Sequence, residues 1–542
     1  MVRTSFFNLL TQINDQKQIL VKKRQKIFDN TKESGRKHLM MLFLLFLIPL
    51  AGCEYSKPKQ KLFVMPMMAG EVSSGSVILQ ARLTARDTII YDDIHDVESV
   101  FNARVQGKEG WVRFYLSDNI RLEEPIVSEW RKGTEESDYI IKENFTSLLP
   151  ATKYYYLSEF GTDKENTYRS KIQSFQTLPS EDESENVSFV MVTGSHLDRF
   201  YLGGGFGKPS LQGADAYTAP DKYLGFPAFE AITELEPDFF IGNGDNVYYD
   251  HPPDMKSKTR EELRANWQRQ FSMPRIREMF AQVPTFWMLD DHDHRFDDSD
   301  TVAFNERFGL HPSHELAMET WMEQLPLTTK SWEETKLYRR IRAGKDLELW
   351  LVEGRAYRSP NRMPDGPDKS IWGEEQKNWL KSTLKQSDAT FKVLVTPTPM
   401  VGPDDGYKSD NHTNPDGFRY EGDAFFDWLT REGFLEENFY IICGDRHWKY
   451  HSVHPSGFEE ISCGAMVDQN SRIGREPGDP KSTDPEGEIV QLYSDPEPTG
   501  GFLHVETKPE NAENLFPSLV FTLYDDEGSI LYQYTKNADN GL

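Results

Sequence analysis

Cysteine is scarce in this 542-residue sequence, which contains only Cys53, Cys443 and Cys463. Three cysteines are too few for a disulfide framework, and their spacing is not that of a zinc finger. The lack of a cysteine cluster argues against a structural zinc site. Cys443 and Cys463 can pair in an oxidising compartment, or they can lie as two buried thiols beside core strands.

Positive charge is also in deficit, since 61 Lys and Arg residues face 87 Asp and Glu residues, for a net charge of −26 at pH 7. A chain this acidic is a poor partner for nucleic acid, and we expect none. The excess of carboxylates suits the binding of divalent cations, although solubility alone also accounts for it. With 37% hydrophobic and 13% aromatic residues, the chain can form sizeable cores in two or three domains.

Long apolar runs are lacking as well. The apolar block at residues 39–50 falls short of the ~20 residues that a bilayer-spanning helix needs. Basic residues precede this block, and Ala51, Gly52 and Cys53 follow it, which is the pattern of a secretory signal. No later stretch is long enough to span a membrane.

The end of this segment, Leu50-Ala51-Gly52-Cys53, resembles the bacterial lipobox, in which the cysteine is acylated and becomes the new N-terminus. We therefore predict an exported bacterial lipoprotein with a signal at residues 1–53, a tether at 54–62 and lipidation of Cys53. The lipid anchor would be its only contact with the membrane.

Residues 63–178 show short alternating segments with no helical pattern. Such spacing predicts a β-sandwich of the immunoglobulin or fibronectin type. The acidic run at residues 181–185 is a plausible linker to the next domain. The expected strands lie within residues 76–83, 111–116, 138–141, 149–157 and 172–178.

Residues 187–535 alternate apolar strands with helix-like stretches, which predicts an α/β domain with a covered sheet. Helices are expected at 228–235, 260–280 and 374–384, a long surface loop at 465–500, and further strands at 501–535. The expected strands are residues 188–193, 238–243, 285–289, 347–352, 391–396 and 439–443.

Residues that can bind metal or donate protons follow four of these strands. In open α/β sheets, ligands bind at the carboxyl ends of the strands, and charges there are costly unless they are paired or metal-bound. Carboxylate, imidazole and phenolate groups suit Fe, Mn, Zn or Ca, and a shared Asp can bridge two cations. The blocks are Gly194-Ser195-His196, Gly244-Asp245-Asn246-Val247-Tyr248, Asp290-Asp291-His292-Asp293 and Gly444-Asp445-Arg446-His447.

The order and spacing of these blocks resemble the alkaline phosphatase D (PhoD-like) family of calcineurin-like metallophosphoesterases. The resemblance extends to residues 175–179, 353–359 and 372–380. It implies an α/β (α+β) protein in which the β-sandwich precedes a four-layer α/β/β/α metallophosphoesterase domain. It also implies hydrolysis of a phosphoester substrate by a metal-activated water, and it leaves the oligomeric state open.

The resemblance also implies roles for single residues. Asp245 would bridge two metals, Tyr248 would be a phenolate ligand, Asp291 would take a ligand position that is usually Asn, and Asp445 and His447 would complete the shells. His292 would be the general acid. Arg355 would contact phosphate, or else form a salt bridge with a neighbouring carboxylate.

Two departures from the family pattern concern the metals. His196 stands where the family usually has a cysteine that binds iron, which makes zinc or manganese more plausible than iron. Asp297-Asp298 stands where an Asn is common, and the extra charge favours calcium. We therefore expect two or more metal ions, Fe or Zn/Mn together with Ca.

Two alternatives stay open at this point. The same centre can cleave phosphodiesters or phospholipids. The chain can also be a non-catalytic surface-binding lipoprotein with a decayed enzyme domain, a hypothesis supported by His196 and opposed by the intact acidic blocks.

Overall fold

The computed structural model describes residues 61–94, 96–203, 215–302, 311–510 and 515–538. The predicted signal with Cys53, and residues 54–60 of the predicted tether, therefore lie outside the described residues. Lys61–Leu542 form one compact unit. In the described part of this unit, no helix has the length and apolarity that a membrane crossing requires.

Two large mixed sheets form the centre of the unit. The nine-stranded sheet has the order β22-β21-β20-β10-β11-β12-β1-β2-β6, and β10, β11, β12 and β1 are parallel neighbours. Its strands are β1 Phe63–Gly70, β2 Ser76–Thr84, β6 Ile140–Thr146, β10 Val187–Val192, β11 Phe239–Asn243, β12 Thr285–Met288, β20 Phe502–Lys508, β21 Ser518–Tyr524 and β22 Ile530–Asn537.

The seven-stranded sheet has the order β13-β14-β15-β16-β18-β17-β19, and β14, β15, β16 and β18 are parallel neighbours. Its strands are β13 Arg339–Ala343, β14 Leu347–Leu351, β15 Phe391–Thr396, β16 Phe439–Cys443, β17 Lys449–Val453, β18 Glu459–Cys463 and β19 Val490–Ser494.

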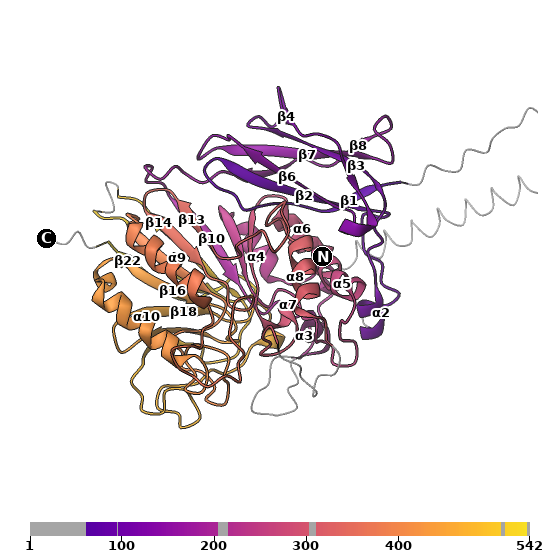
Figure 1. Cartoon of the computed structure of the whole chain (residues 1–542). Coiled ribbons are helices and arrows are strands. Elements are labelled where there is room, and N and C mark those ends of the chain that lie inside the picture. Colours follow the sequence, from indigo (N-terminus) through magenta and orange to yellow (C-terminus); the bar gives the residue numbers. More distant parts are fainter. Residues whose placement is uncertain (1–60, 95, 204–214, 303–310, 511–514, 539–542) are drawn as a thin grey trace, which may run out of the picture. The chain divides into compact units, whose positions relative to one another are not determined.

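Helices cover the outer face of each large sheet (Figure 1). The helices α4 Ala228–Glu234, α5 Arg260–Phe271, α6 Pro274–Phe280 and α8 His314–Gln324 pack on the nine-stranded sheet, and α9 Gly373–Gln386 and α10 Arg419–Arg431 pack on the seven-stranded sheet. The two sheets face each other, so the layers run α/β/β/α, as expected from the resemblance.

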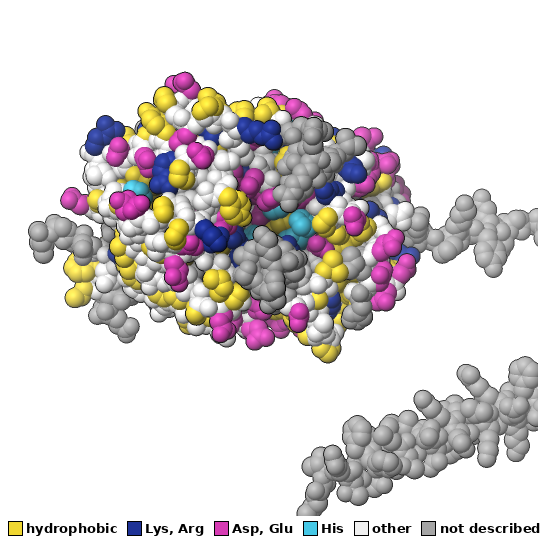
Figure 2. Space-filling model, turned by 90° about the horizontal axis from the view of Figure 1, so that it is seen from below, with side chains coloured by type: hydrophobic (Ala, Val, Ile, Leu, Met, Phe, Trp, Pro, Cys, Tyr) yellow, Lys and Arg dark blue, Asp and Glu magenta, His cyan; other side chains and the backbone are white. Residues whose placement is uncertain are grey.

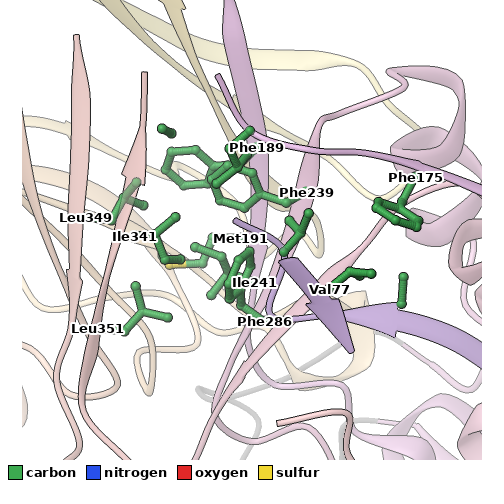
Figure 3. Packing of buried hydrophobic residues seen from close by; sticks show 14 of the residues in the cluster. Val77, Phe175, Phe189, Met191, Phe239, Ile241, Phe286, Ile341, Leu349 and Leu351 are labelled. Atoms are coloured by element: carbon green, nitrogen blue, oxygen red, sulfur yellow. The ribbon is translucent and has the colours of Figure 1, made fainter. Parts of the chain in front are cut away.

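The apolar strands are continuous because both of their faces are buried. In β10, Phe189 and Met191 point into the core between the sheets, whereas Val190 and Val192 face the helices. Figure 3 shows side chains of β10, β11 and β12 lying opposite Ile341, Leu349 and Leu351 of the other sheet. Successive side chains of a strand alternate between faces, so each strand serves two cores at once.

A third sheet, of six strands, packs over β1, β2 and β6, and this is the predicted β-sandwich. The chain connects the two regions through the segment between β9 and β10. The parallel pairing of β1 with β12 joins them a second time. The third sheet consists of β3 Gly110–Ser117, β4 Ile126–Val127, β5 Arg131–Gly133, β7 Lys153–Gly161, β8 Tyr168–Arg169 and β9 Gln173–Gln176.

Two details differ from expectation. The short helix α2 Val97–Asn102 interrupts the β region. Residues 465–500 are not a long surface loop, because they contain β19 and the turn η6 Asp468–Asn470, and Met466 and Asn470 are buried. Glycine, proline and acidic residues indicate turns, but they do not show whether a turn packs against other elements.

Cys443 and Cys463 are free, buried thiols. Burial raises the pKa of the Cys463 thiol to about 12, so it stays protonated at neutral pH. Of the two alternatives, the structure therefore has the unpaired buried thiols.

Candidate metal centre

The predicted blocks meet where the carboxyl ends of strands from both sheets come together. Asn243 at the end of β11 donates from Nδ2 to the carbonyl of Thr396 at the end of β15 (2.9 Å). Thr193, after β10, forms a parallel bridge with Ala465, after β18. The loops that follow the strands of the two sheets therefore form one edge.

The turn after β11 is held in left-handed backbone conformations. Gly244 has φ 76°, and a Cβ there would lie 2.4 Å from the Asp290 Cβ, so only glycine fits. Asp245 follows with φ 53°, and Asp445 after β16 has φ 58°. Such backbone is costly for non-glycine residues and gathers at functional sites, and here it turns two carboxylates toward the same space.

Carboxylates from three strand ends form a buried cluster. Ligand atoms of Asp290, Asp291 and Asp445 lie within 4.8 Å of one another, and so do those of Asp245, Asp291 and His292. Asp291 belongs to both groups and links them. These residues, far apart in the sequence, thus form one neighbourhood that can hold more than one cation.

His447 and Tyr248 adjoin this cluster through Asp245. His447 Nε2 lies 3.5 Å from Asp245 Oδ2, and the Tyr248 hydroxyl donates to the same oxygen (2.8 Å). Asn470 in turn donates to the Tyr248 hydroxyl (3.0 Å). Burial and Asp245 raise the pKa of Tyr248 well above its ordinary value, so this phenol must release a proton before it can act as a phenolate ligand.

Three carboxylate oxygens in the cluster are buried without a hydrogen-bond donor. They are Asp245 Oδ1, Asp290 Oδ2 and Asp291 Oδ1. A buried polar atom without a partner is costly, and a buried carboxylate is costlier still. Oxygen atoms of this kind are the ligands that hard and borderline cations prefer, so the donor set fits metal ions.

Burial and mutual repulsion shift the pKa values of the carboxyl groups in the cluster. Burial raises the pKa of Asp290, Asp291 and Asp245. Burial also opposes ionisation of Asp445, but Arg446 and Lys408 outweigh it and lower the pKa of that carboxyl. The cluster therefore needs further positive charge to hold all four carboxylates ionised, and bound cations supply that charge.

His292, the predicted general acid, is oriented by Asp250. Its Nδ1 lies 2.8 Å from Asp250 Oδ1, and the backbone N–H of Asp297 donates to the other oxygen of Asp250 (3.1 Å). Burial lowers the pKa of His292, but Asp250 and Asp291 raise it well above its ordinary value. The imidazole is held in one orientation, with Asp297 Oδ1 4.0 Å from Nε2.

Arg355 forms the salt bridge that was the alternative to a phosphate contact. Its guanidinium is 0% exposed and lies 2.6 Å from Asp290 Oδ1 and 3.3 Å from Asp410 Oδ2. It also donates to the carbonyl of Ser299 (3.0 Å). With its donor groups engaged by the protein, Arg355 positions the carboxylates and is not open to a substrate phosphate.

His196 lies beside the carboxylate cluster rather than within it. Its ring stacks on Tyr248 with centroids 3.7 Å apart, and its Nδ1 accepts the backbone N–H of Arg199 (3.3 Å). Its ligand atoms group instead with those of Asp198 and His251. His196, which was predicted to be a metal ligand, therefore lies near the carboxylate cluster, but its neighbouring potential ligands are Asp198 and His251.

Sequence reasoning assigned no role to several residues of this site. Asp290 lies within one of the quoted strand-end blocks, and Asp250 follows another by two residues, so their positions in the sequence could have indicated a role. Asp410 and Lys408 come from a loop and Asn470 from the turn η6, and none of the three directly follows a strand end that would indicate a role. Lys408 Nζ lies 2.7 Å from Asp298 Oδ1, which neutralises one of the extra acidic residues.

Figure 2 shows a face of the molecule on which histidine side chains lie together in a hollow, with acidic side chains nearby. His292 is 8% exposed, and the side chain of His447 is 14% exposed. These two imidazoles therefore lie at the boundary between the buried carboxylates and solvent.

Comparison with solved structures supports the architecture. The chain is similar to a structure of PhoD, with a TM-score of 0.66 and 14% identity over 88% of this chain and 90% of that one. It is also similar to the purple acid phosphatase PPD1 from seeds of yellow lupin (Lupinus luteus), with a TM-score of 0.52 and 11% identity over 89% and 75% of the two chains. At these identities the likeness concerns the fold.

No curated protein sequence matches the chain. The family model described as PhoD-like phosphatase matches residues 214–488, just over half of the chain, including three of the four strand-end blocks. The resemblance seen in the sequence is thereby confirmed. The chain belongs to the PhoD-like phosphatase family and is a phosphoester hydrolase.

Proposed function

We propose that the chain is an exported, lipid-anchored phosphoester hydrolase whose cations are held by Asp245, Asp291 and Asp445, with His447 and Tyr248 beside them. The observation that carries this proposal is the set of buried carboxylate oxygens without a donor at the joined strand ends. Bound cations would supply Lewis acidity and lower the pKa of a bound water.

The chain's own residues supply positioning and a proton. Asp250 holds Nδ1 of His292, so Nε2 can keep its proton until the P–O ester bond breaks. The attacking water adds its oxygen to phosphorus and releases a proton to solvent, while the leaving alkoxide takes the proton from His292 and departs as an alcohol. His292 then regains a proton from solvent, so the protons balance over one turnover. Arg355 acts indirectly, because it fixes Asp290 against the repulsion of its neighbours.

The donor types support Fe or Zn/Mn at the histidine side and Ca at the acidic side. Imidazole and carboxylate ligands together suit borderline cations. A third acidic group, Asp291 with Asp297 and Asp298, offers oxygen atoms alone, which suit calcium. Elemental analysis of the purified protein tests this assignment, and two transition-metal ions with no calcium would contradict it.

The decisive variant is Asp245→Asn, which keeps the shape of the side chain and removes its charge. We expect kcat/KM to fall about 10³-fold or more, because a shared metal ligand is worth several kcal/mol and about 1.4 kcal/mol is a factor of ten. The matched control is Asp238→Asn at the opposite end of β11, where Oδ2 accepts the backbone N–H of Ser188.

Hydrolysis of p-nitrophenyl phosphate and unfolding in urea are measured for both variants. Full turnover by folded Asp245→Asn protein would rule out its place in the centre. Comparing p-nitrophenyl phosphate with its bis ester decides between monoesterase and diesterase activity, the alternative within this class.

The lipid anchor is a proposal from the sequence of residues 50–53. Cys53→Ala should move the chain from the membrane fraction to the soluble fraction of the host cell. It should also abolish incorporation of labelled fatty acid. Unchanged fractionation of the variant would exclude the anchor and leave the hydrolase proposal intact.

A further inference from the structure

Three potential ligands outside the carboxylate cluster lie together at the end of β10 and in the loop after β11. His196 precedes the helix α3 Leu197–Leu202, Asp198 lies in its first turn, and His251 comes from the loop. One ligand atom from each lies within 4.8 Å of the other two. We call these residues the His-Asp-His group.

This group contains polar atoms with no hydrogen-bond partner. Asp198 is 6% exposed, and its Oδ1 is buried without a donor. Nδ1 of His251 is likewise buried without a hydrogen bond, although it lies 3.4 Å from Asp198 Oδ2. A mere ion pair between Asp198 and His251 would leave the other carboxylate oxygen unsatisfied.

The space beside the group is not filled by side chains. Asp198 and His251 line a small cavity together with Tyr248, Asn266, Gln270 and the apolar Phe101, Leu197 and Val247, and His196 adjoins it through its ring contacts with Tyr248 and His251. Its volume of about 10 Å³ is on the order of a single water molecule, which Asn266 and Gln270 can hold as one further ligand of an ion. Two imidazoles and one carboxylate are the ligands of open transition-metal sites, which keep further positions for water.

We propose that His196, Asp198 and His251 bind a borderline divalent transition-metal ion such as Zn²⁺, Fe²⁺ or Co²⁺, separate from the cations of the carboxylate cluster. Calcium is disfavoured because it prefers an all-oxygen shell. The site rests on the geometry of these three residues and does not depend on the proposed hydrolytic chemistry.

An ion at this site would act on the carboxylate cluster through Tyr248. The ring of His196 stacks on that of Tyr248, and the Tyr248 hydroxyl donates to Asp245. The rings of His251 and His196 meet edge to face with centroids 4.7 Å apart. Coordination of an ion by His196 would therefore fix the orientation of the imidazole ring on which the Tyr248 ring stacks.

Cobalt binding to the purified full chain tests the proposal. After removal of bound metal with a chelator, Co²⁺ bound per chain and its visible d–d absorption are measured for the wild type, Asp198→Asn and His251→Gln. His504→Gln on β20 is the control, because His504 belongs to none of the candidate ligand groups among the described residues. Asp291→Asn reports on the carboxylate cluster.

We expect Asp198→Asn and His251→Gln each to lose one Co²⁺ per chain and the absorption of a histidine-bound ion, and His504→Gln to lose neither. Asp291→Asn should lose ions from the carboxylate cluster and keep this one. The proposal is overturned if Asp198→Asn or His251→Gln binds as much Co²⁺ as the wild type. It is also overturned if these two variants both lose every bound ion. Neither the amount of bound Co²⁺ nor its absorption depends on activity. A failure of the hydrolase proposal would therefore leave this test unaffected.

Discussion

At the residue scale, the site brings together carboxylates that repel one another and arginines that hold them. Asp290 is buried beside Asp291 and Asp445, and Arg355 is the cation in direct contact with it among the described residues. Breaking such a buried pair leaves an uncompensated charge in a medium of low polarity. The energetic importance of Arg355 therefore comes from its place between carboxylates.

Arg355→Met should lower the free energy of unfolding of the metal-free protein by about 3–5 kcal/mol. The control is Arg121→Met, because Arg121 and Glu123 pair with side chains 80% and 61% exposed. That change should cost less than about 1 kcal/mol. Urea titrations measure both, and equal costs would show that Arg355 does not stabilise the cluster.

Lys142 should make stability depend on pH. Burial lowers the pKa of Lys142 from 10.5 to about 7, although Glu323 raises it, and Nζ donates to the carbonyl of Met322 (2.6 Å). Between pH 7 and 10 the unfolded chain binds a proton here that the folded chain does not, so this contribution to stability grows with rising pH. It is lost as the pH falls through about 7.

Lys142→Met removes this titration. The free energy of unfolding of the wild type relative to Lys142→Met should therefore rise from pH 7 to pH 10, measured by urea titration at several pH values. A difference between the two proteins that is constant over this range would contradict the lowered pKa.

At the element scale, strand and helix positions followed the patterns in the sequence closely. The six α/β strands expected from apolar runs correspond to β10, β11, β12, β14, β15 and β16. The expected helical stretch at 260–280 divides into α5 and α6, because Pro274 begins the second helix. The segment at 465–500 was missed because its buried contacts are made with distant parts of the chain.

Helix α5 begins with a capping box that should matter for stability. Thr259 accepts the backbone N–H of Glu262, and the Glu262 carboxylate accepts that of Thr259 (3.0 Å). Thr259→Ala should cost about 1 kcal/mol of unfolding free energy, whereas Thr259→Ser should retain most of it. Urea midpoints check this, and an equal loss in both variants would mean that the hydroxyl is not the cap.

At the scale of the whole molecule, the nine-stranded sheet joins the β-sandwich to the phosphatase layers. Glu71 donates its backbone N–H to the carbonyl of Thr285 (3.1 Å), and Thr285 donates its hydroxyl to the carbonyl of Ala69 (3.1 Å). Side chains of β1, β2, β10 and β12 share one apolar core. The β-sandwich therefore protects the edge of β12 as well as forming its own fold.

A chain that begins at residue 180 should consequently be insoluble or lose cooperative unfolding, because β12 becomes an exposed edge and part of the core is uncovered. Expression, solubility and thermal unfolding of this shortened chain measure the effect. A soluble fragment with the melting temperature of the full chain would instead support the predicted division into separate domains.

The sequence by itself determined six strands of the α/β domain and the strand-end blocks, because these depend on local periodicity and on the edge at which parallel strands end. The four-layer arrangement was expected from the family resemblance. The blocks alone placed Asp245, Asp291 and Asp445 at one edge of the sheet. The tertiary structure alone decided that Arg355 is enclosed by carboxylates and that His196 groups with Asp198 and His251. Such contacts depend on how loops from separate strands pack, and no local pattern records that packing.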